Sequence, residues 1–439
     1  MITISPLSND ATAYLKAPFV PLADYYGIND SALRAIENQV WAGHTALHNG
    51  RDDLAIELWK AASIQRKRRA RELGLAEFKT VTLSGRWVQN IGHFVYVDAL
   101  LKLASLGCVE DVDKVVLYVN MYRGNRISNR VLLDLYRPHL GVVGDGVGDL
   151  SDDVRQVAHW MRSDLDYVSL ADNDFVDPWE LVVRANDIWK GLRRKPLVSL
   201  SQEIADRGRA FCERMNIAKN GWFAVIHARA PGYNGGSQCV RDVELTGYEP
   251  IIEKILALGG GVVRLGGAHM PTMSHPHVFD YAGFAQKDPA LDIYLASQCR
   301  FFIGCSSGLE VVPFLFGVPS LWLNSAPIGD SPWSEDIFYA PKKFHHSGSG
   351  AIASLDDIVN ASLAHSQFAS TYTDKGFGIH QLSDREMESA FDFFFRHAVM
   401  KEALGEDSRR ITGAFRAKCE ALGLRQRGTA IPSAVKHLI

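Results

Sequence analysis

Residues 301–319, FFIGCSSGLEVVPFLFGVP, join an apolar strand to a helix through a turn of small residues. The strand ends at Gly304, and Ser306, Ser307 and Gly308 lead into the helix. A helix N-terminus leaves backbone N–H groups unpaired and carries partial positive charge, so these residues would suit a phosphate. The same serines can also be ordinary helix caps, and the spacing alone leaves both interpretations open.

The residues on both sides of this turn alternate between apolar strands and amphipathic helices, linked by short loops. Such alternation predicts a parallel sheet covered by helices. The predicted strands are WFAVIHAR (222–229), GVVRLGG (261–267), RFFIGCS (300–306) and VPSLWLN (318–324), and the predicted helices are GYEPIIEKILALGG (247–260), DPALDIYLASQ (288–298) and SGLEVVPFLFG (307–317).

A second alternating block begins near residue 78, with KTVTLS (79–84), FVYVDALLKLASLG (94–107), DKVVLYVN (113–120) and HLGVVGD (139–145). We therefore expect an α/β fold of two Rossmann-like domains that face a cleft. The expected divisions are a helical N-terminal extension (1–75), an acceptor domain (76–200), a nucleotide-sugar domain (201–345) and a helical C-terminal tail (346–439), the two domain roles being implied by the resemblance described below.

The N-terminal extension contains WAGHTALHNGRDDLAIELWKAA (41–62), which resembles one tetratricopeptide unit. A single unit cannot bury its own apolar face, so we expect it to pack on the next domain. The basic run RKRRAR (66–71) ends its second helix. That run is typical of a solvated helix face, and contact with an anionic surface is the alternative.

The overall composition is that of a soluble globular protein of 439 residues. Its 47 Lys and Arg residues against 50 Asp and Glu residues argue against a broad nucleic-acid binder. The six cysteines form no CxxC pair, which indicates reduced and mostly buried thiols. The N-terminus lacks the pattern of a signal peptide, and no apolar run reaches about 18 residues, so a cytoplasmic protein is expected.

The strand WFAVIHAR brings His227 and Arg229 to its carboxyl end, where open α/β sheets bind ligands. Arginine offers a rigid fork for phosphate oxygens, although pairing with a loop carboxylate such as Asp242 is the alternative. The glycine-containing loop 232–242 can be a lid over a ligand or an ordinary surface loop. Arg264 and Gly266 end another strand, where they can approach a nucleotide or form a simple turn.

The segment 292–323, DIYLASQCRFFIGCSSGLEVVPFLFGVPSLWL, resembles the donor domain of GT-B glycosyltransferases. The similarity is to ADP-heptosyltransferases and to fucosyltransferases of the O-fucosyl and α1,6 kinds. Over residues 75–345 the chain resembles bacterial GT-B-type glycosyltransferases found with surface-polysaccharide genes. The matching residues are Asp292, Leu295, Gly304, Ser306, Ser307, Gly308, Gly317 and Pro319.

The resemblance implies a transferase that moves a sugar from a nucleotide-diphosphate donor to a hydroxyl of a glycan, lipid-linked sugar or protein. It implies no bound cofactor and no metal, with His227, Arg229 and the Ser306–Gly308 turn at the donor diphosphate. Ile91-Gly92-His93 stands where ADP-heptosyltransferases carry an acidic base after the first strand. Histidine can deprotonate a hydroxyl near neutral pH, but His93 can equally bind phosphate or cap the helix.

Weaker candidates complete the predicted site. Asp98 is a second possible base, and Asp292 can lie near the ribose or be a plain helix residue. The D-x-D of Asp172 and Asp174 would suit a metal-dependent GT-A transferase, yet the pattern is weak. The histidine-rich loop 269–277 lacks a carboxylate or cysteine that would complete a metal site.

Other functions remain open at this stage. Non-hydrolysing sugar-nucleotide epimerases share the architecture and need no acceptor. A non-catalytic binding or assembly protein is the third interpretation, because histidine replaces the acidic residue at position 93. The helices of residues 30–75 would then be a docking face for a protein or for the inner face of a membrane. Some retaining GT-B families carry a Glu-x7-Glu pair, and Val318 stands where the partner of Glu310 would be, which favours inversion over retention.

Overall fold

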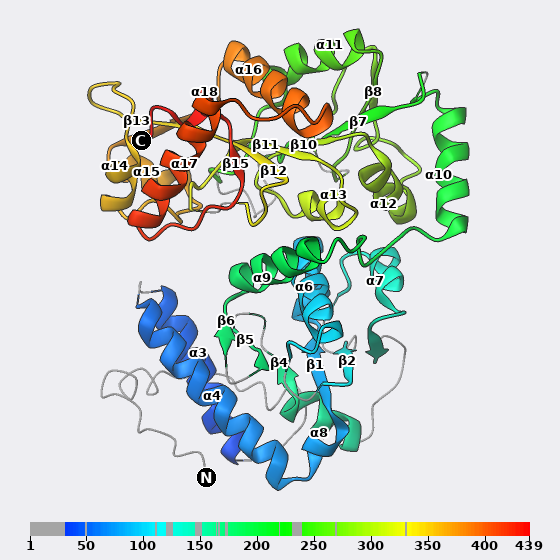
Figure 1. Cartoon of the computed structure of the whole chain (residues 1–439), viewed down its shortest axis with the longest axis vertical. Helices are drawn as coiled ribbons and strands as arrows, with labels where there is room; N and C mark the ends of the chain where they lie inside the picture. The colour runs from blue at the N-terminus through cyan, green and yellow to red at the C-terminus, as the bar shows by residue number, and fades with distance from the viewer. Residues whose placement is uncertain are drawn as a thin grey trace. The chain divides into compact units, whose positions relative to one another are not determined.

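The computed structural model describes residues 31–48, 51–109, 112–119, 126–144, 152–163, 165, 167–171, 174–218, 220–230, 239–267, 270–329 and 332–439. Contacts divide the chain into two compact units (Figure 1). Unit 1 comprises residues 1–129 and 136–194, and unit 2 comprises residues 130–135 and 195–439. Each unit is built around its own parallel sheet.

Unit 1 contains a four-stranded sheet in the order β3-β2-β1-β4, with every pairing parallel. Helix α6 (Phe94–Ser105) is buried over most of its length because apolar residues occupy nearly all of its faces. The strands are β1 (Thr80–Ser84), β2 (Lys114–Tyr118), β3 (Gly141–Val143) and β4 (Arg162–Ser163). The other elements are η1 (Leu75–Phe78), α5 (Arg86–Gln89), η2 (Ile91–His93), α7 (Arg130–Tyr136), α8 (Asp152–Trp160), the antiparallel pair β5 (Val168–Ser169) and β6 (Phe175–Val176), and α9 (Pro178–Gly191); most of α7, residues 130–135, belongs to unit 2.

Helices α3 (Ser31–His48) and α4 (Asp52–Glu72) lie side by side and bury their shared apolar face (Figure 1). Their core continues into the rest of unit 1 through Trp160 of α8 and Tyr167. Arg162 of β4 donates to Glu37 of α3 across 2.9 Å, with both side chains buried. The helical pair therefore packs on the adjacent sheet, as its inability to bury its own face predicts.

Unit 2 contains a seven-stranded parallel sheet in the order β15-β12-β11-β10-β7-β8-β9. Its inner strands are buried on both faces, as a parallel sheet covered by helices requires. The chain starts at β7, adds β8 and β9 on one side, and then returns to add β10 on the other. The strands are β7 (Phe223–Ile226), β8 (Gly261–Arg264), β9 (Val278–Asp280), β10 (Phe302–Gly304), β11 (Ser320–Ser325), β12 (Ile337–Pro341) and β15 (Thr429–Ala430).

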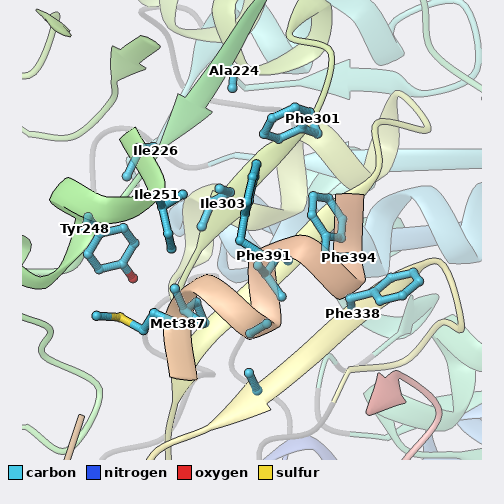
Figure 2. Close-up of a cluster of buried hydrophobic side chains, with 14 of the residues drawn as sticks. Ala224, Ile226, Tyr248, Ile251, Phe301, Ile303, Phe338, Met387, Phe391 and Phe394 are labelled. Atoms are coloured by element: carbon cyan, nitrogen blue, oxygen red, sulfur yellow. The ribbon is translucent and has the colours of Figure 1, made fainter. Parts of the chain in front are cut away.

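Helices cover both faces of this sheet, with α11 and α16 on one face and α12 and α13 on the other (Figure 1). Figure 2 shows Phe391 and Phe394 of α16 gathered with Ile303 of β10. Phe394 also meets Phe301 edge to face at 5.7 Å. The helices up to β12 are α10 (Gln202–Arg214), η5 (Leu245–Tyr248), α11 (Glu249–Ala257), α12 (Pro289–Gln298), η6 (Gly308–Glu310) and α13 (Val311–Leu315).

The C-terminal segment is mainly helical, as expected, but it also contributes strands to unit 2. β15 closes one edge of the seven-stranded sheet, and β14 (Phe377–His380) pairs with β13 (Lys343–His346). The sequence analysis missed both strands because each is short and follows a polar helix. The helices are α14 (Leu355–Asn360), α15 (Ala369–Asp374), α16 (Asp384–Phe394) with η7 (Phe395–Val399), α17 (Glu406–Ala421) and α18 (Pro432–Val435).

The expected fold class, α/β with two parallel-sheet units, a preceding helical pair and a mainly helical C-terminal segment, is confirmed. All six cysteines are free, and five of them are buried. Within the described residues, no helix combines the length and apolar character needed to cross a bilayer.

Candidate functional site

The candidate site lies where β7 and β10, adjacent strands in the sheet, reach their carboxyl ends. The two strands pair in parallel, and the N–H of His227 donates to the carbonyl of Ile303 at 2.8 Å. The order of strand addition reverses between β7 and β10, which makes this edge the topological switch point of the sheet. Open α/β sheets bind ligands in the crevice at such a point. The residues after each strand, His227 to Ala230 and Cys305 to Ser307, therefore occupy the expected ligand edge.

His227 connects the ends of three strands. Its Nδ1 lies 3.0 Å from the carbonyl oxygen of Leu265, beyond β8, and its Nε2 lies 2.9 Å from Oγ of Ser307, beyond β10. A carbonyl only accepts, so Nδ1 carries the proton and Nε2 accepts from the serine hydroxyl. Burial lowers the pKa of His227 to about 4. The ring is therefore neutral at pH 7 and holds the turn in place.

The turn after β10 combines a helix cap with an unsatisfied hydroxyl. Ser307 is the N-cap of η6, and its N–H donates to Oε1 of Glu310 at 2.8 Å. The capping interpretation of Ser307 is therefore confirmed. The hydroxyl of Ser306 is buried and makes no hydrogen bond with the described residues. Leaving such a group unpaired costs about 1–3 kcal/mol, which a bound ligand could recover.

Three cations contact either this turn or Asp242, the residue after Arg241. Arg229 is 5% exposed, and its Nε lies 3.3 Å from Oδ1 of Asp242, so the predicted alternative of a loop carboxylate partner is confirmed. Nε of Arg241 donates to the carbonyl oxygen of Ser306 at 2.6 Å. Nζ of Lys342, directly after β12, donates to the carbonyl oxygen of Asp242 at 2.5 Å.

Positive charge exceeds negative charge among these side chains. Burial raises the pKa of Glu310 well above its ordinary value, which favours the uncharged form of this carboxyl. Its Oε2 has no hydrogen-bond partner among the described residues. Arg229, Arg241 and Lys342 outnumber the two carboxyls beside them, those of Asp242 and Glu310. We call Arg229, Arg241, Lys342 and the Ser306–Ser307 turn the anion site.

Arg264, Gly266 and Asp292 lie on the β8 side of His227. Arg264 is fully buried and donates to both carboxylate oxygens of Asp280, at 3.1 and 2.9 Å, so it is not the surface arginine of the alternative prediction. Lys287 donates to the carbonyl oxygen of Gly266 and lies 3.3 Å from Asp292. Burial raises the pKa of Asp292. The structure thus brings these three predicted donor residues together, and internal contacts engage the charged groups of Arg264 and Asp292.

His93 and Asp98 follow the first strand of unit 1 but differ in their surroundings. His93 is partly exposed, and its Nδ1 lies 2.7 Å from the carbonyl oxygen of Arg86, so Nδ1 carries the proton in the neutral ring. Asp98 is 1% exposed, lies 2.6 Å from Nζ of Lys102, and accepts from Tyr136 at 3.1 Å. Asp98 is therefore part of a buried ion pair, and no exposed face is left for an acceptor.

Other predicted features either lie outside the described residues or have partners within the chain. Asp172 and Asn173 of the D-x-D, His269 and residues 232–238 of the proposed lid lie outside the described residues. Asp174 pairs with Arg184, and His275 lies 3.3 Å from Glu253. In the part of the chain that the structure describes, no three His, Cys, Asp or Glu side chains gather closely enough to hold a metal ion.

Sequence reasoning missed Arg241 and Lys342. Lys342 follows the buried strand IFYAP, so the same strand-end signal that identified Arg229 was available. The predicted strands stopped at residue 324, which left that signal unused. Arg241 lies within the predicted loop 232–242, where no strand end marks it. Only the fold brings its guanidinium to the carbonyl oxygen of Ser306.

Comparisons with known proteins find matches among solved structures. No protein-family model matches the sequence, and a search of curated proteins finds no match. Similar solved structures include the glycosyl transferase family 9 protein from Veillonella parvula DSM 2008 (11% identity, 74% of this chain, 97% of that chain, TM-score 0.42). Another is E. coli ADP-heptose LPS heptosyltransferase II (11% identity, 74% of this chain, 100% of that chain, TM-score 0.36). A third is E. coli heptosyltransferase WaaC with ADP (10% identity, 73% of this chain, 99% of that chain, TM-score 0.36).

Proposed function

We propose that this protein is a GT-B-type glycosyltransferase whose unit 2 binds the diphosphate of a nucleotide-sugar. One observation carries the proposal: three cations and an unpaired buried hydroxyl meet at the switch point of a Rossmann-ordered sheet. Charge-assisted hydrogen bonds from arginine and lysine are the usual recognition of phosphate oxygens. The sequence resemblance of residues 75–345 supports the same substrate class, and the fold by itself does not establish function.

Three residues of the anion site, Arg241, Lys342 and Ser306, have a proposed task at the diphosphate. Arg241 and Lys342 stabilise the negative charge that develops on the leaving diphosphate, because they are held in place before the reaction. The Ser306 hydroxyl donates to a phosphate oxygen. His227 and Glu310 hold the turn through their hydrogen bonds to Ser307. Fixed cations of this kind supply the charge stabilisation that a metal ion supplies in GT-A enzymes.

We propose His93 as the base that takes the proton from the acceptor hydroxyl. The carbonyl of Arg86 fixes the proton on Nδ1, so the lone pair of Nε2 is the basic one. Direct attack by that hydroxyl on the donor sugar would invert its configuration. The acceptor would be a glycan, a lipid-linked sugar or a protein, in glycan or polysaccharide biosynthesis. Asp98 is dropped from the proposal because of its buried pairing with Lys102.

Thermal unfolding in the presence of GDP, UDP, ADP, CMP and dTDP tests the donor site, because a ligand that binds the native state raises the midpoint. Each nucleotide is measured with EDTA and then with magnesium. One nucleoside diphosphate is expected to raise the midpoint in EDTA. Arg241→Ala should abolish the shift, and the control Arg409→Ala, an exposed arginine of α17, should retain it. No shift with any nucleotide would contradict the donor assignment.

Product analysis separates transfer from the alternatives. The nucleotide-sugar matching the best nucleotide is incubated with the protein, with and without candidate acceptors. Release of the nucleoside diphosphate, raised by an acceptor, is expected of a transferase. Conversion to an epimer without any acceptor would instead identify an epimerase. Tight nucleotide binding with neither reaction would favour a binding protein.

A further inference from the structure

A basic turn projects from unit 1 where α4 ends and η1 begins. It comprises residues 68–79, and we call it the 68–79 turn. Gly74 has a φ of 71°, a left-handed conformation that reverses the chain between the two helices. Eight of the nine residues 71–79 are exposed, and only Leu75 is partly covered.

The turn presents two large apolar side chains to solvent. Phe78 is 59% exposed and Leu73 is 40% exposed. A single exposed apolar residue is ordinary on a protein surface. Two of them within six residues, in a segment where Leu75 is the one other large apolar residue and is partly covered, need a separate explanation.

Cations outnumber carboxylates in the same segment. The segment contains four cations, Arg68, Arg69, Arg71 and Lys79, and two carboxylates, Glu72 and Glu77. Arg68 lies 3.1 Å from Glu72, but both side chains are well exposed, and such surface pairs contribute little. The rest of the basic run points inward: Arg66 is buried and donates to the carbonyl of Arg162, and Lys67 donates to Ser169.

We propose that the 68–79 turn docks on the surface of an anionic lipid bilayer. Leu73 and Phe78 would enter the boundary between headgroups and acyl chains, while the arginine and lysine groups meet lipid phosphates. The net charge of the segment, four cations against two carboxylates, is complementary to such a surface. This explains the exposed apolar pair and the basic run together, and it favours one of the two predicted uses of that run.

The position of the turn in unit 1 leaves the proposed base accessible. The turn directly precedes β1, so it lies at the amino edge of the sheet. His93 follows β1 and lies at the carboxyl edge of the same sheet. Docking through the turn therefore holds the protein at a membrane without covering His93. The proposal does not depend on the anion site, and either can fail alone.

Co-sedimentation of the full chain with vesicles tests the proposal. The vesicles are phosphatidylcholine alone and phosphatidylcholine with 30% phosphatidylglycerol, at low and at physiological salt. The protein is expected to sediment with the anionic vesicles and to dissociate as salt rises. Arg71→Gln with Lys79→Gln should weaken binding about 25-fold, about fivefold for each charge. Leu73→Ala with Phe78→Ala should weaken it about tenfold.

Matched controls exclude effects on folding and on charge in general. Phe368→Ala removes an equally exposed phenylalanine from unit 2, and Arg409→Gln with Arg410→Gln removes two exposed charges. Both controls should bind vesicles like the unaltered protein. Phe78→Trp should bind anionic vesicles at least as well as the unaltered protein, because tryptophan favours the membrane interface. Absence of sedimentation with anionic vesicles, equal binding to neutral ones, or unchanged binding of the turn variants would overturn the proposal.

Discussion

His227 and His93 both follow the first strand of their unit, yet their environments are opposite. His227 is buried, both of its ring nitrogens are engaged, and burial lowers its pKa to about 4. His93 is partly exposed, its Nδ1 lies 2.7 Å from the carbonyl oxygen of Arg86, and its Nε2 lies 3.5 Å from the side-chain nitrogen of Asn90. Parallel strands bring a histidine to the ligand edge in both units, but burial then decides what the ring can do.

The comparison shows why chain position alone does not assign a role. A neutral ring with both nitrogens occupied cannot exchange protons with a substrate, so His227 serves as a connection between strands. A partly exposed ring whose Nδ1 carries the proton keeps the Nε2 lone pair as the acceptor for a proton from a substrate. We therefore assign a supporting role to His227 in unit 2 and a reacting role to His93 in unit 1. The following predictions test this assignment.

The largest effect is expected for His93. His93→Ala should lower the turnover of the nucleotide-sugar by about 10²- to 10⁴-fold, because general-base catalysis contributes that much. The affinity for the nucleoside diphosphate should not change, since unit 2 binds it. Steady-state kinetics with the acceptor identified by product analysis measures both. His139→Ala, an exposed histidine of unit 1, is the control, and an equal loss of turnover there would remove His93 as the base.

Asp98 should affect folding rather than chemistry. Asp98→Ala leaves the buried ammonium of Lys102 without its carboxylate, which should lower the free energy of unfolding by about 3–5 kcal/mol. Urea unfolding at pH 7 measures this, with the exposed Asp53→Ala as control. Turnover by the fraction that remains folded should be near normal. A stable Asp98 variant without activity would return Asp98 to the list of candidate bases.

His227 should make stability depend on pH. Its pKa of about 4 in the folded protein lies below the ordinary value of 6.5, so between these values the unfolded chain binds more protons. The stability contribution is fully present above pH 6.5 and is lost as the pH falls towards 4, by about 3 kcal/mol. Urea unfolding between pH 7 and pH 4.5 should show a smaller slope for His227→Gln than for the unaltered protein. Equal slopes would mean that the ring titrates normally.

Substitution of Arg241 should have the smallest effect of the four substitutions, and it should change only the binding of the nucleoside diphosphate. Arg241→Ala removes charge-assisted hydrogen bonds to the diphosphate and should weaken its binding about 10- to 100-fold. The side chain is partly exposed, so the thermal midpoint without ligand should change little. Arg409→Ala provides the comparison for loss of one arginine. Unaltered affinity in the Arg241 variant would remove this residue from the anion site.

The fold was largely predictable because strand–helix alternation is a local pattern. The turn from Gly304 to Gly308, the end of β7 at His227 and the helical pair before residue 75 were all expected. The short strands β14 and β15 were not, since a strand of two to four residues takes its identity from its partner strand. The sequence also does not show which charged side chains are buried, and the roles of Asp98 and Arg264 depend on their burial.

The most direct test of the central claim compares ligands that differ only in phosphate. Calorimetric titration in EDTA would measure the affinity of the best nucleoside diphosphate, its monophosphate and its nucleoside, for the unaltered protein and for Arg241→Ala. The account predicts that the diphosphate binds far more tightly than the nucleoside, and that Arg241→Ala removes most of this difference. Equal affinities for diphosphate and nucleoside, or a preference that survives the substitution, would contradict an anion site at the ends of β7, β10 and β12.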